Sequence, residues 1–152
     1  MRAAVARDVP AIVALLADDD LGARREDPSA LDAYESAFAR LDASPDQLLA
    51  VAELGGRVVG TLQLSFLFGL SHQGATRAQV EAVRVASGLR EQGIGREMMH
   101  WAIAQARARD CHLVQLTSDR SRTRAHAFYE RLGFVGSHLG MKLVLGDSPA
   151  RD

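Results

Sequence analysis

The sequence has a single cysteine, Cys111, and no apolar run near the roughly 20 residues that cross a membrane. One cysteine excludes an internal disulfide and a zinc site built from several cysteines. The apolar neighbours of Cys111 favour a buried, inert thiol, with a nucleophile as the alternative. Charge of one sign is also missing, because 18 basic residues face 19 acidic ones and leave a formal net charge of −1. That balance argues against a general nucleic-acid binder.

We do not expect the first segment to be a secretory signal. The first segment, MRAAVARDVPAIVALLADDD, has a short apolar run, but Asp8 and Pro10 precede it and three aspartates follow. That arrangement is typical of a capped helix rather than of a leader. We expect a cytoplasmic protein without a membrane partner. The length of 152 residues predicts a single domain over residues 1–146, followed by a flexible tail over 147–152.

The apolar periodicity predicts two helices, three strands, then helix, strand, helix and strand. The helices are expected after Asp8, over 26–43, after Gly95 and over 125–132, and the strands over 47–54, 57–67, 78–87, 111–118 and 137–145. A tight turn at Gly55–Gly56 joins the first two strands, and residues 68–76 are expected to form an exposed loop. Because strands and helices do not alternate from the start, the order favours a mixed α/β sandwich over a doubly wound sheet.

A glycine-rich turn, REQGIG over residues 90–95, follows a strand and opens an apolar helix. Helix starts expose unpaired N–H groups and the positive end of the helix dipole, so they bind anions. Gly93 and Gly95 let the backbone approach an anion closely, and Arg84, Arg90 and Arg96 add positive charge. The pattern predicts a phosphate-type site, although two glycines alone are also compatible with a plain tight turn.

Two common phosphate motifs do not match this turn. A P-loop needs G-x-x-x-x-G-K-[ST], which the sequence lacks. A dinucleotide fingerprint needs a third glycine where Met98 stands. The missing glycine and the strand order therefore disfavour a nicotinamide-dependent oxidoreductase.

The pattern [Arg or Gln]-x-x-Gly-x-[Gly or Ala] is satisfied by Arg90, Gly93 and Gly95, follows the strand VEAVRV and precedes AHAFYERLGF by about 30 residues. In this combination the chain resembles the GNAT superfamily of acyl-CoA-dependent N-acetyltransferases over about residues 1–145. The resemblance implies an α/β fold with a twisted, mostly antiparallel mixed sheet, whose splayed central strands are flanked by helices. It also implies acetyl-CoA as cosubstrate, no metal, and coenzyme A diphosphate as the anion.

The resemblance further assigns cofactor contacts. Val83 and Val85 would pair with the pantetheine arm, and the N–H near Val83 would face the thioester carbonyl. At Arg122 the family often has asparagine, so the contact made there is open. The implied cofactor-binding residues are Val83, Arg84, Val85, Arg90, Glu91, Gln92, Gly93, Ile94, Gly95, Arg96, Arg122, Ala125 and Phe128.

Two residues are the catalytic candidates that the resemblance implies. Glu81, just before the cofactor strand residues, would accept a proton from the acceptor amine, and a solvent-facing glutamate is the alternative. Tyr129 in AFYERLGF would protonate the departing thiolate, and it would pack beside Phe128 in either case. His72 and His138 are weaker candidates.

The implied reaction transfers acetyl to a primary amine of a small molecule or peptide by direct attack in a ternary complex. A non-catalytic acyl-CoA sensor of the same fold is the alternative, although a sensor needs neither Glu81 nor Tyr129. The acceptor would be chosen by residues 20–35 and 67–78. The acidic residues Asp18, Asp19, Asp20, Glu26 and Asp27 would either attract a cationic acceptor or form a solvated face. Homodimers are common in the family, and no residue here indicates one.

Overall fold

The structure is a computed structural model that describes residues 1–18 and 22–145. Its helices are α1 (Val9–Ala17), α2 (Leu31–Asp42), α3 (Ser71–Gly74), α4 (Ile94–Ala108) and α5 (Thr123–Arg131). Its strands are β1 (Arg2–Ala3), β2 (Gln47–Leu54), β3 (Arg57–Leu67), β4 (Arg77–Val85) and β5 (Leu113–Leu116). The chain forms two compact units, Met1–Leu116 and Thr117–Asp152, and each is described by itself.

The first unit is built on one five-stranded sheet with the order β1-β2-β3-β4-β5. Neighbouring strands run antiparallel except β4 and β5, which are parallel. The expected mixed, mostly antiparallel sheet is therefore confirmed. The β2–β3 hairpin turns at Gly55 and Gly56, whose φ angles are +56° and +76°. Two consecutive positive φ angles are what a two-residue hairpin turn of this kind requires, and glycine adopts them without strain.

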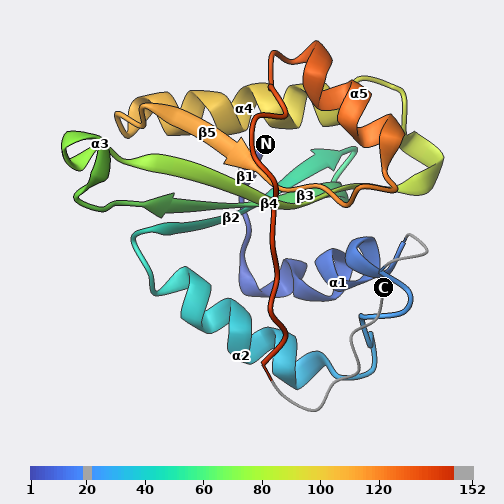
Figure 1. Ribbon diagram of the computed structural model, residues 1–152. Helices are drawn as coiled ribbons and strands as arrows, with labels where there is room; N and C mark the ends of the chain where they lie inside the picture. The colour runs from blue at the N-terminus through green and yellow to red at the C-terminus, as the bar shows by residue number, and fades with distance from the viewer. Residues whose placement is uncertain (19–21, 146–152) are drawn as a thin grey trace. The chain divides into compact units, whose positions relative to one another are not determined.

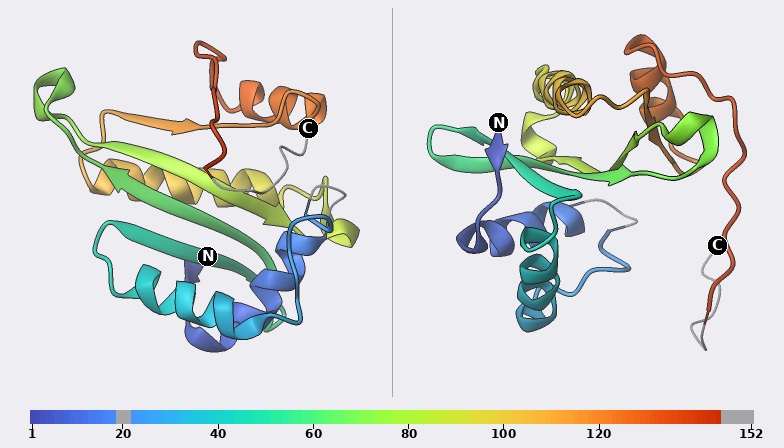
Figure 2. Two further views of the ribbon diagram at one scale, coloured as in Figure 1. Left: turned by 60° about the horizontal axis from the view of Figure 1, so that its bottom comes forward. Right: turned by 90° about the vertical axis from the view of Figure 1, so that its left-hand side faces the viewer.

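Strand alternation divides the unit into layers. In β3, Leu62 and Leu64 are fully buried on the face that packs against α4, where Met98 is also buried. Thr61 and Gln63 alternate with them and line a cavity beside α1 and α2 on the opposite face. Figure 1 shows α4 on one side of the sheet and α1 and α2 on the other, and Figure 2 shows the same layers from two further directions.

The N-terminal strand is attached through an ion pair that the sequence reading did not anticipate. Asp8 precedes α1 as expected, but its carboxylate makes no capping bond to the helix. It accepts hydrogen bonds from the Arg2 guanidinium at 2.6 Å and 2.9 Å and from the Val5 N–H at 2.8 Å. Arg2 also donates to Glu53 at 2.9 Å, so β1, α1 and β2 are tied together by one guanidinium.

Helix α2 begins later than the expected range of 26–43. The carboxylate of Asp27 accepts from the N–H and the hydroxyl of Ser29, at 2.9 Å and 2.6 Å, and so closes a turn over Pro28. An aspartate can satisfy such a local turn instead of a helix start. The helix therefore starts at Leu31.

The second unit contains α5, which is followed by Gly133 with a φ of +90°. The strand expected over 137–145 is wrong, because these residues form no regular element. Their apolar side chains are exposed, with Met141 at 88% and Leu143 at 85% of full accessibility. An alternating pattern forms a strand only where a neighbouring strand accepts its hydrogen bonds. The tail predicted over 147–152 lies outside the described residues.

Two further expectations can be compared with the structure. Cys111 is half-buried, and desolvation raises the pKa of its thiol, which opposes a nucleophilic role. Within the described residues, no helix has the length and apolar character that a membrane crossing demands.

Candidate functional site

One edge of β4 is open along the second half of the strand. On one side β4 pairs with β3 as far as Val85, which lies opposite Gly60. On the other side the described pairing with β5 ends at Val80 and Leu116. Beyond this point the backbone of residues 83–85 faces a side where β5 no longer runs. Such an edge offers N–H and C=O groups to an extended ligand that contains amides.

A β-bulge lies at the point where this edge opens. Gln63 pairs with Glu81 and Thr61 with Arg84, so β4 has one residue more than β3 over this interval. Ala82 in the bulge has a φ of +52°, a left-handed conformation that is uncommon for a residue with a side chain. Bulges and strained backbone are frequent next to active sites, where they re-aim neighbouring groups.

Beyond the open edge, the chain reaches the start of α4 through a glycine turn. Gly93 precedes the helix with a φ of +86°, and Glu91 is also left-handed at +65°. The first backbone bond of the helix runs from the Glu97 N–H to the Gly93 carbonyl, so the N–H groups of residues 94–96 precede the helical ladder. A Cβ at Gly93 would meet nothing within 4 Å, so the backbone angle, and not crowding, requires glycine there. This helix start has the properties of an anion-binding site.

Asp18 at the end of α1 holds the turn, a role that no sequence signal indicated. Its carboxylate accepts from the Ser87 N–H at 2.7 Å. The Arg90 guanidinium donates to the Asp18 carbonyl at 2.7 Å and to the Val85 carbonyl at 3.0 Å. Arg90 therefore fastens the turn to α1 and to β4, and its contact with a diphosphate stays a prediction. Asp19 and Asp20 lie outside the described residues.

Glu81, the expected base, is exposed and stands on a sheet face that carries several amides. Gln63 is its partner across β3, and Gln79 precedes it by two residues on the same face of β4. Gln79 accepts a hydrogen bond from Gln115 of β5 at 2.7 Å, and Gln63 donates to Gln47 of β2 at 2.9 Å. These glutamines were missed in the sequence. Alternation along β4 could have found Gln79, but only the strand register places Gln63 and Gln115 beside it.

A cavity of about 100 Å³ adjoins the bulge. Ala82, Gln63 and Thr61 line it from the sheet, and apolar residues of α1 and α2 close the other sides. The cavity therefore places apolar surface next to the residue that follows Glu81, on the side expected for the acceptor.

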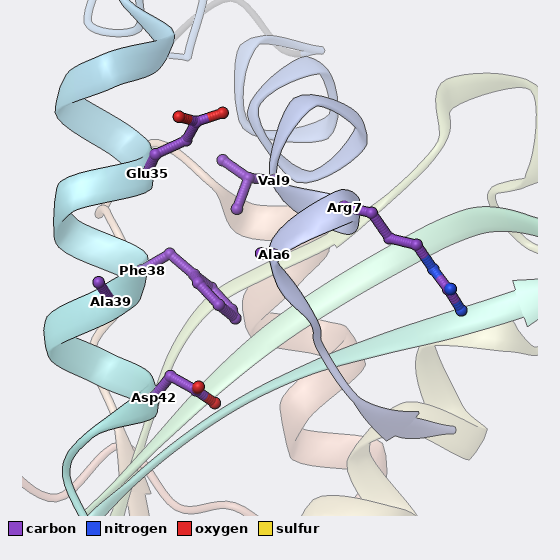
Figure 3. Close-up of a pocket in the computed structure, with 7 residues that line it drawn as sticks. All are labelled: Ala6, Arg7, Val9, Glu35, Phe38, Ala39 and Asp42. Carbon is purple, nitrogen blue, oxygen red and sulfur yellow. The ribbon is translucent and has the colours of Figure 1, made fainter.

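A larger hollow of about 550 Å³ lies between α2 and the start of α1, and Figure 3 shows it. The residues that line it are Ala6, Arg7, Val9, Glu35, Phe38, Ala39 and Asp42. None of them belongs to β4 or α4, so this hollow is separate from the open edge.

The remaining predicted residues lie in the second unit. Arg122 directly precedes α5, and its carbonyl accepts from the Ala125 N–H at 2.9 Å. The ring of Tyr129 packs edge-on against Phe128 at 5.1 Å and Phe134 at 5.9 Å between centroids. The packing role of Tyr129 is thus visible, while its role as an acid stays a prediction.

Of the weaker candidates, His72 lies beside His112 with ring centroids 5.2 Å apart, and His138 contacts Ser137.

Two sets of predicted residues therefore emerge. Residues 81–96 come together in the first unit around the open edge and the start of α4, and residues 122–129 share one helix and its start in the second. In the part of the chain that the structure describes, no group of three or more His, Cys, Asp or Glu side chains is placed to hold a metal ion.

Comparison with known proteins gives a consistent result. The sequence profile of the Acetyltransferase (GNAT) family matches residues 10–134, a range that reaches into both units. The aminoalkylphosphonate N-acetyltransferase of Salmonella typhimurium is 31% identical over 106 residues, which make up 70% of this chain and 68% of that protein.

Two solved structures extend the likeness to nearly the whole chain. A protein described as a transcriptional regulator from Bacillus halodurans C-125 is 42% identical, with a TM-score of 0.91 over 95% of this chain and 97% of its own. A protein described as an acetyltransferase, from Agrobacterium tumefaciens strain C58, is 28% identical, with a TM-score of 0.85 over 95% of this chain and 98% of its own.

Proposed function

Because the chain belongs to the GNAT family of acetyltransferases, we propose that it transfers the acetyl group of acetyl-CoA to a primary amine of a small molecule. The observation that carries the proposal is the open edge of β4 leading into the helix start at Gly93. The similarity to an aminoalkylphosphonate N-acetyltransferase supports N-acetylation and makes aminoalkylphosphonates the first acceptors to test.

The residues present fit acetyl-CoA. Its pantetheine arm contains two amides, which can pair with the extended backbone at Val83 and Val85. Its diphosphate matches the N–H groups of residues 92–96 at the start of α4. When bound, the cosubstrate supplies an activated acyl thioester, and the N–H of Val83 would stabilise the negative charge on the carbonyl oxygen during attack.

The acceptor must lose a proton. An alkyl amine with a pKa near 10.4 is only about one part in 10³ neutral at pH 7, a handicap of about 4–5 kcal/mol. Glu81 would accept this proton, directly or through a water molecule. The amine nitrogen forms the new bond to the acyl carbon and the carbon–sulfur bond breaks. The thiolate leaves and would take a proton from the Tyr129 hydroxyl, and the second proton that the amine nitrogen loses as the amide forms would restore the phenol through solvent.

The test is release of free thiol from acetyl-CoA in the presence of aminoalkylphosphonates, amino acids, polyamines, aminoglycosides and short peptides. We expect turnover with one class of amine and a loss of about 10²-fold or more in Glu81→Gln. Asp42→Asn, which changes an exposed carboxylate at the end of α2, is the control and should match the wild type. Equal activity of Glu81→Gln and the control would contradict the assignment of the base.

A second candidate function is an acyl-CoA sensor. One observation favours it, since a protein with 42% identity is described as a transcriptional regulator. A sensor would gain thermal stability from acetyl-CoA without releasing thiol with any amine in the panel. Turnover that depends on Glu81 would rule it out.

A further inference from the structure

Resting on the proposed function, we infer that the acceptor amine carries an anionic group and that Arg77 is the residue that binds this group. The inference comes from the order of side chains along β4. Arg77, Gln79 and Glu81 alternate with Ala78 and Val80. Ala78 and Val80 are buried, at 0% and 2% of full accessibility, on the face packed against α4, so the other three share the opposite face.

The surroundings of Arg77 leave its charge without a counter-ion. Its neighbours across the strands are Leu67 on β3 and Leu113 on β5. The side chain is half-buried, and it has neither an ion pair nor a hydrogen bond among the described residues. A half-buried charge without a partner is unfavourable, and an anionic ligand would remove that cost.

Other arginines of the same unit show the contrast. Arg2 is held by Asp8 and Glu53, and Arg90 is held by backbone carbonyls and Asp18. Arg109 donates to the Pro45 carbonyl and stacks over Phe66 at 4.0 Å. These guanidinium groups have structural partners, whereas Arg77 lies on the face of the proposed base and keeps its donors available.

The stretch between the two charges is polar and uncharged. The residues paired with 77–81 of β4 are Leu67, Phe66, Ser65, Leu64 and Gln63 on β3 and Leu113, Val114, Gln115 and Leu116 on β5. Arg77 and Glu81 are therefore the charged members of this patch. A cation at one end and a carboxylate at the other complement a zwitterion, whose ammonium group lies at Glu81 and whose anion lies at Arg77. A polycation would be repelled by Arg77.

The spacing limits the acceptor's length. Four residues of β-strand span about 13 Å, and the long arginine side chain can shorten the gap toward Glu81. The chemistry shared by suitable acceptors is a primary amine joined by a short chain to a phosphonate, a phosphate or a carboxylate. Phosphonates and phosphates match the planar guanidinium with two oxygens, as carboxylates do.

The experiment compares steady-state kinetics of the wild type, Arg77→Gln, Arg77→Lys and the control Arg57→Gln, which changes an exposed arginine at the start of β3. The acceptors are 2-aminoethylphosphonate, 3-aminopropylphosphonate and β-alanine, with n-propylamine as the counterpart that lacks the anionic group. We expect Arg77→Gln to lower kcat/KM for the three acceptors that carry an anionic group by about 10- to 100-fold, mainly through KM. Values for n-propylamine and for acetyl-CoA should stay at the wild-type level, and Arg77→Lys should recover part of the loss.

The outcomes separate this inference from the proposed function. If every acceptor, n-propylamine included, reacts equally well with the wild type and Arg77→Gln, the inference is overturned while the acetyltransferase stands. Equal losses for acceptors with and without the anionic group also overturn it, because they indicate a structural role. If no amine reacts with any variant, the proposed function fails, and Arg77 is then tested by thermal unfolding of the acetyl-CoA-bound protein with added n-propylphosphonate. A rise in Tm of the wild type but not of Arg77→Gln supports the inference. Equal rises in Tm refute it.

Discussion

Tyr129 is the residue for which a packing role and a chemical role can be separated. Its ring contacts Phe128 and Phe134 edge-on, and phenylalanine keeps those contacts while it removes the hydroxyl. We expect Tyr129→Phe to lower turnover about tenfold or more, because a thiolate with a pKa near 8.5 leaves fairly well without an acid. The affinity for acetyl-CoA should be unchanged. Thiol release and equilibrium binding measure the two quantities, and wild-type turnover in Tyr129→Phe would refute the acid role.

Arg2 and Asp8 make a pH-dependent contribution to stability. The hydrogen bonds from Arg2 lower the pKa of Asp8, desolvation partly opposes them, and the Val5 N–H adds to the lowering. A folded pKa below the unfolded value of about 3.9 stabilises the protein above that pH, and the stability is lost as the pH falls through the folded pKa. Arg2→Gln should therefore lower the free energy of unfolding at pH 7.

Urea denaturation at pH 7 and at pH 3 tests this pair. The loss of stability on acidification should be smaller in Arg2→Gln than in the wild type, because the main cause of the lowered pKa is gone. Arg7→Gln is the control, since Arg7 acts on Asp8 through its charge and not through a hydrogen bond. If Arg2→Gln loses as much stability between pH 7 and pH 3 as the wild type does, the Arg2–Asp8 ion pair does not govern the pH dependence of stability.

Among the elements, the turn before α4 depends on the end of α1. Asp18 holds the Ser87 N–H and lies beside the Arg90 guanidinium, so the turn is prepared before a ligand arrives. Asp18→Ala should raise the KM for acetyl-CoA by about three- to tenfold, the effect of one exposed hydrogen bond, and leave kcat close to the wild type. Asp42→Ala on α2 is the matched control. A change in kcat without a change in KM would place Asp18 in the chemistry rather than in cofactor binding.

The elements also show what a sequence can predict. Strands β2 and β3 and their glycine turn were predicted to the residue, because alternation and a two-residue turn are local signals. The predicted start of α2 was too early, because Asp27 closes a local turn and aspartate is equally common in local turns and at helix starts. The strand predicted over 137–145 is wrong, because an alternating segment forms a strand only when another strand lies beside it to pair with. That Arg77, Gln79 and Glu81 share a face follows from alternation along one strand, but the neighbours of that face on β3 and β5 needed the register of three strands, which no short segment contains.

For the whole molecule, acetyl-CoA should act as a stabilising ligand of the native chain. A ligand present at 100 times its Kd adds about 2.7 kcal/mol to the free energy of unfolding. For a chain of 152 residues this corresponds to a rise in Tm of about 5–11 °C. Acetyl-pantetheine, which lacks the diphosphate, can pair with the edge of β4 but not with the start of α4, so its shift at equal concentration should be much smaller. Differential scanning calorimetry measures both shifts. Equal shifts would mean that the glycine turn at 90–95 binds no anion, and the helix start would then be only a turn that positions α4.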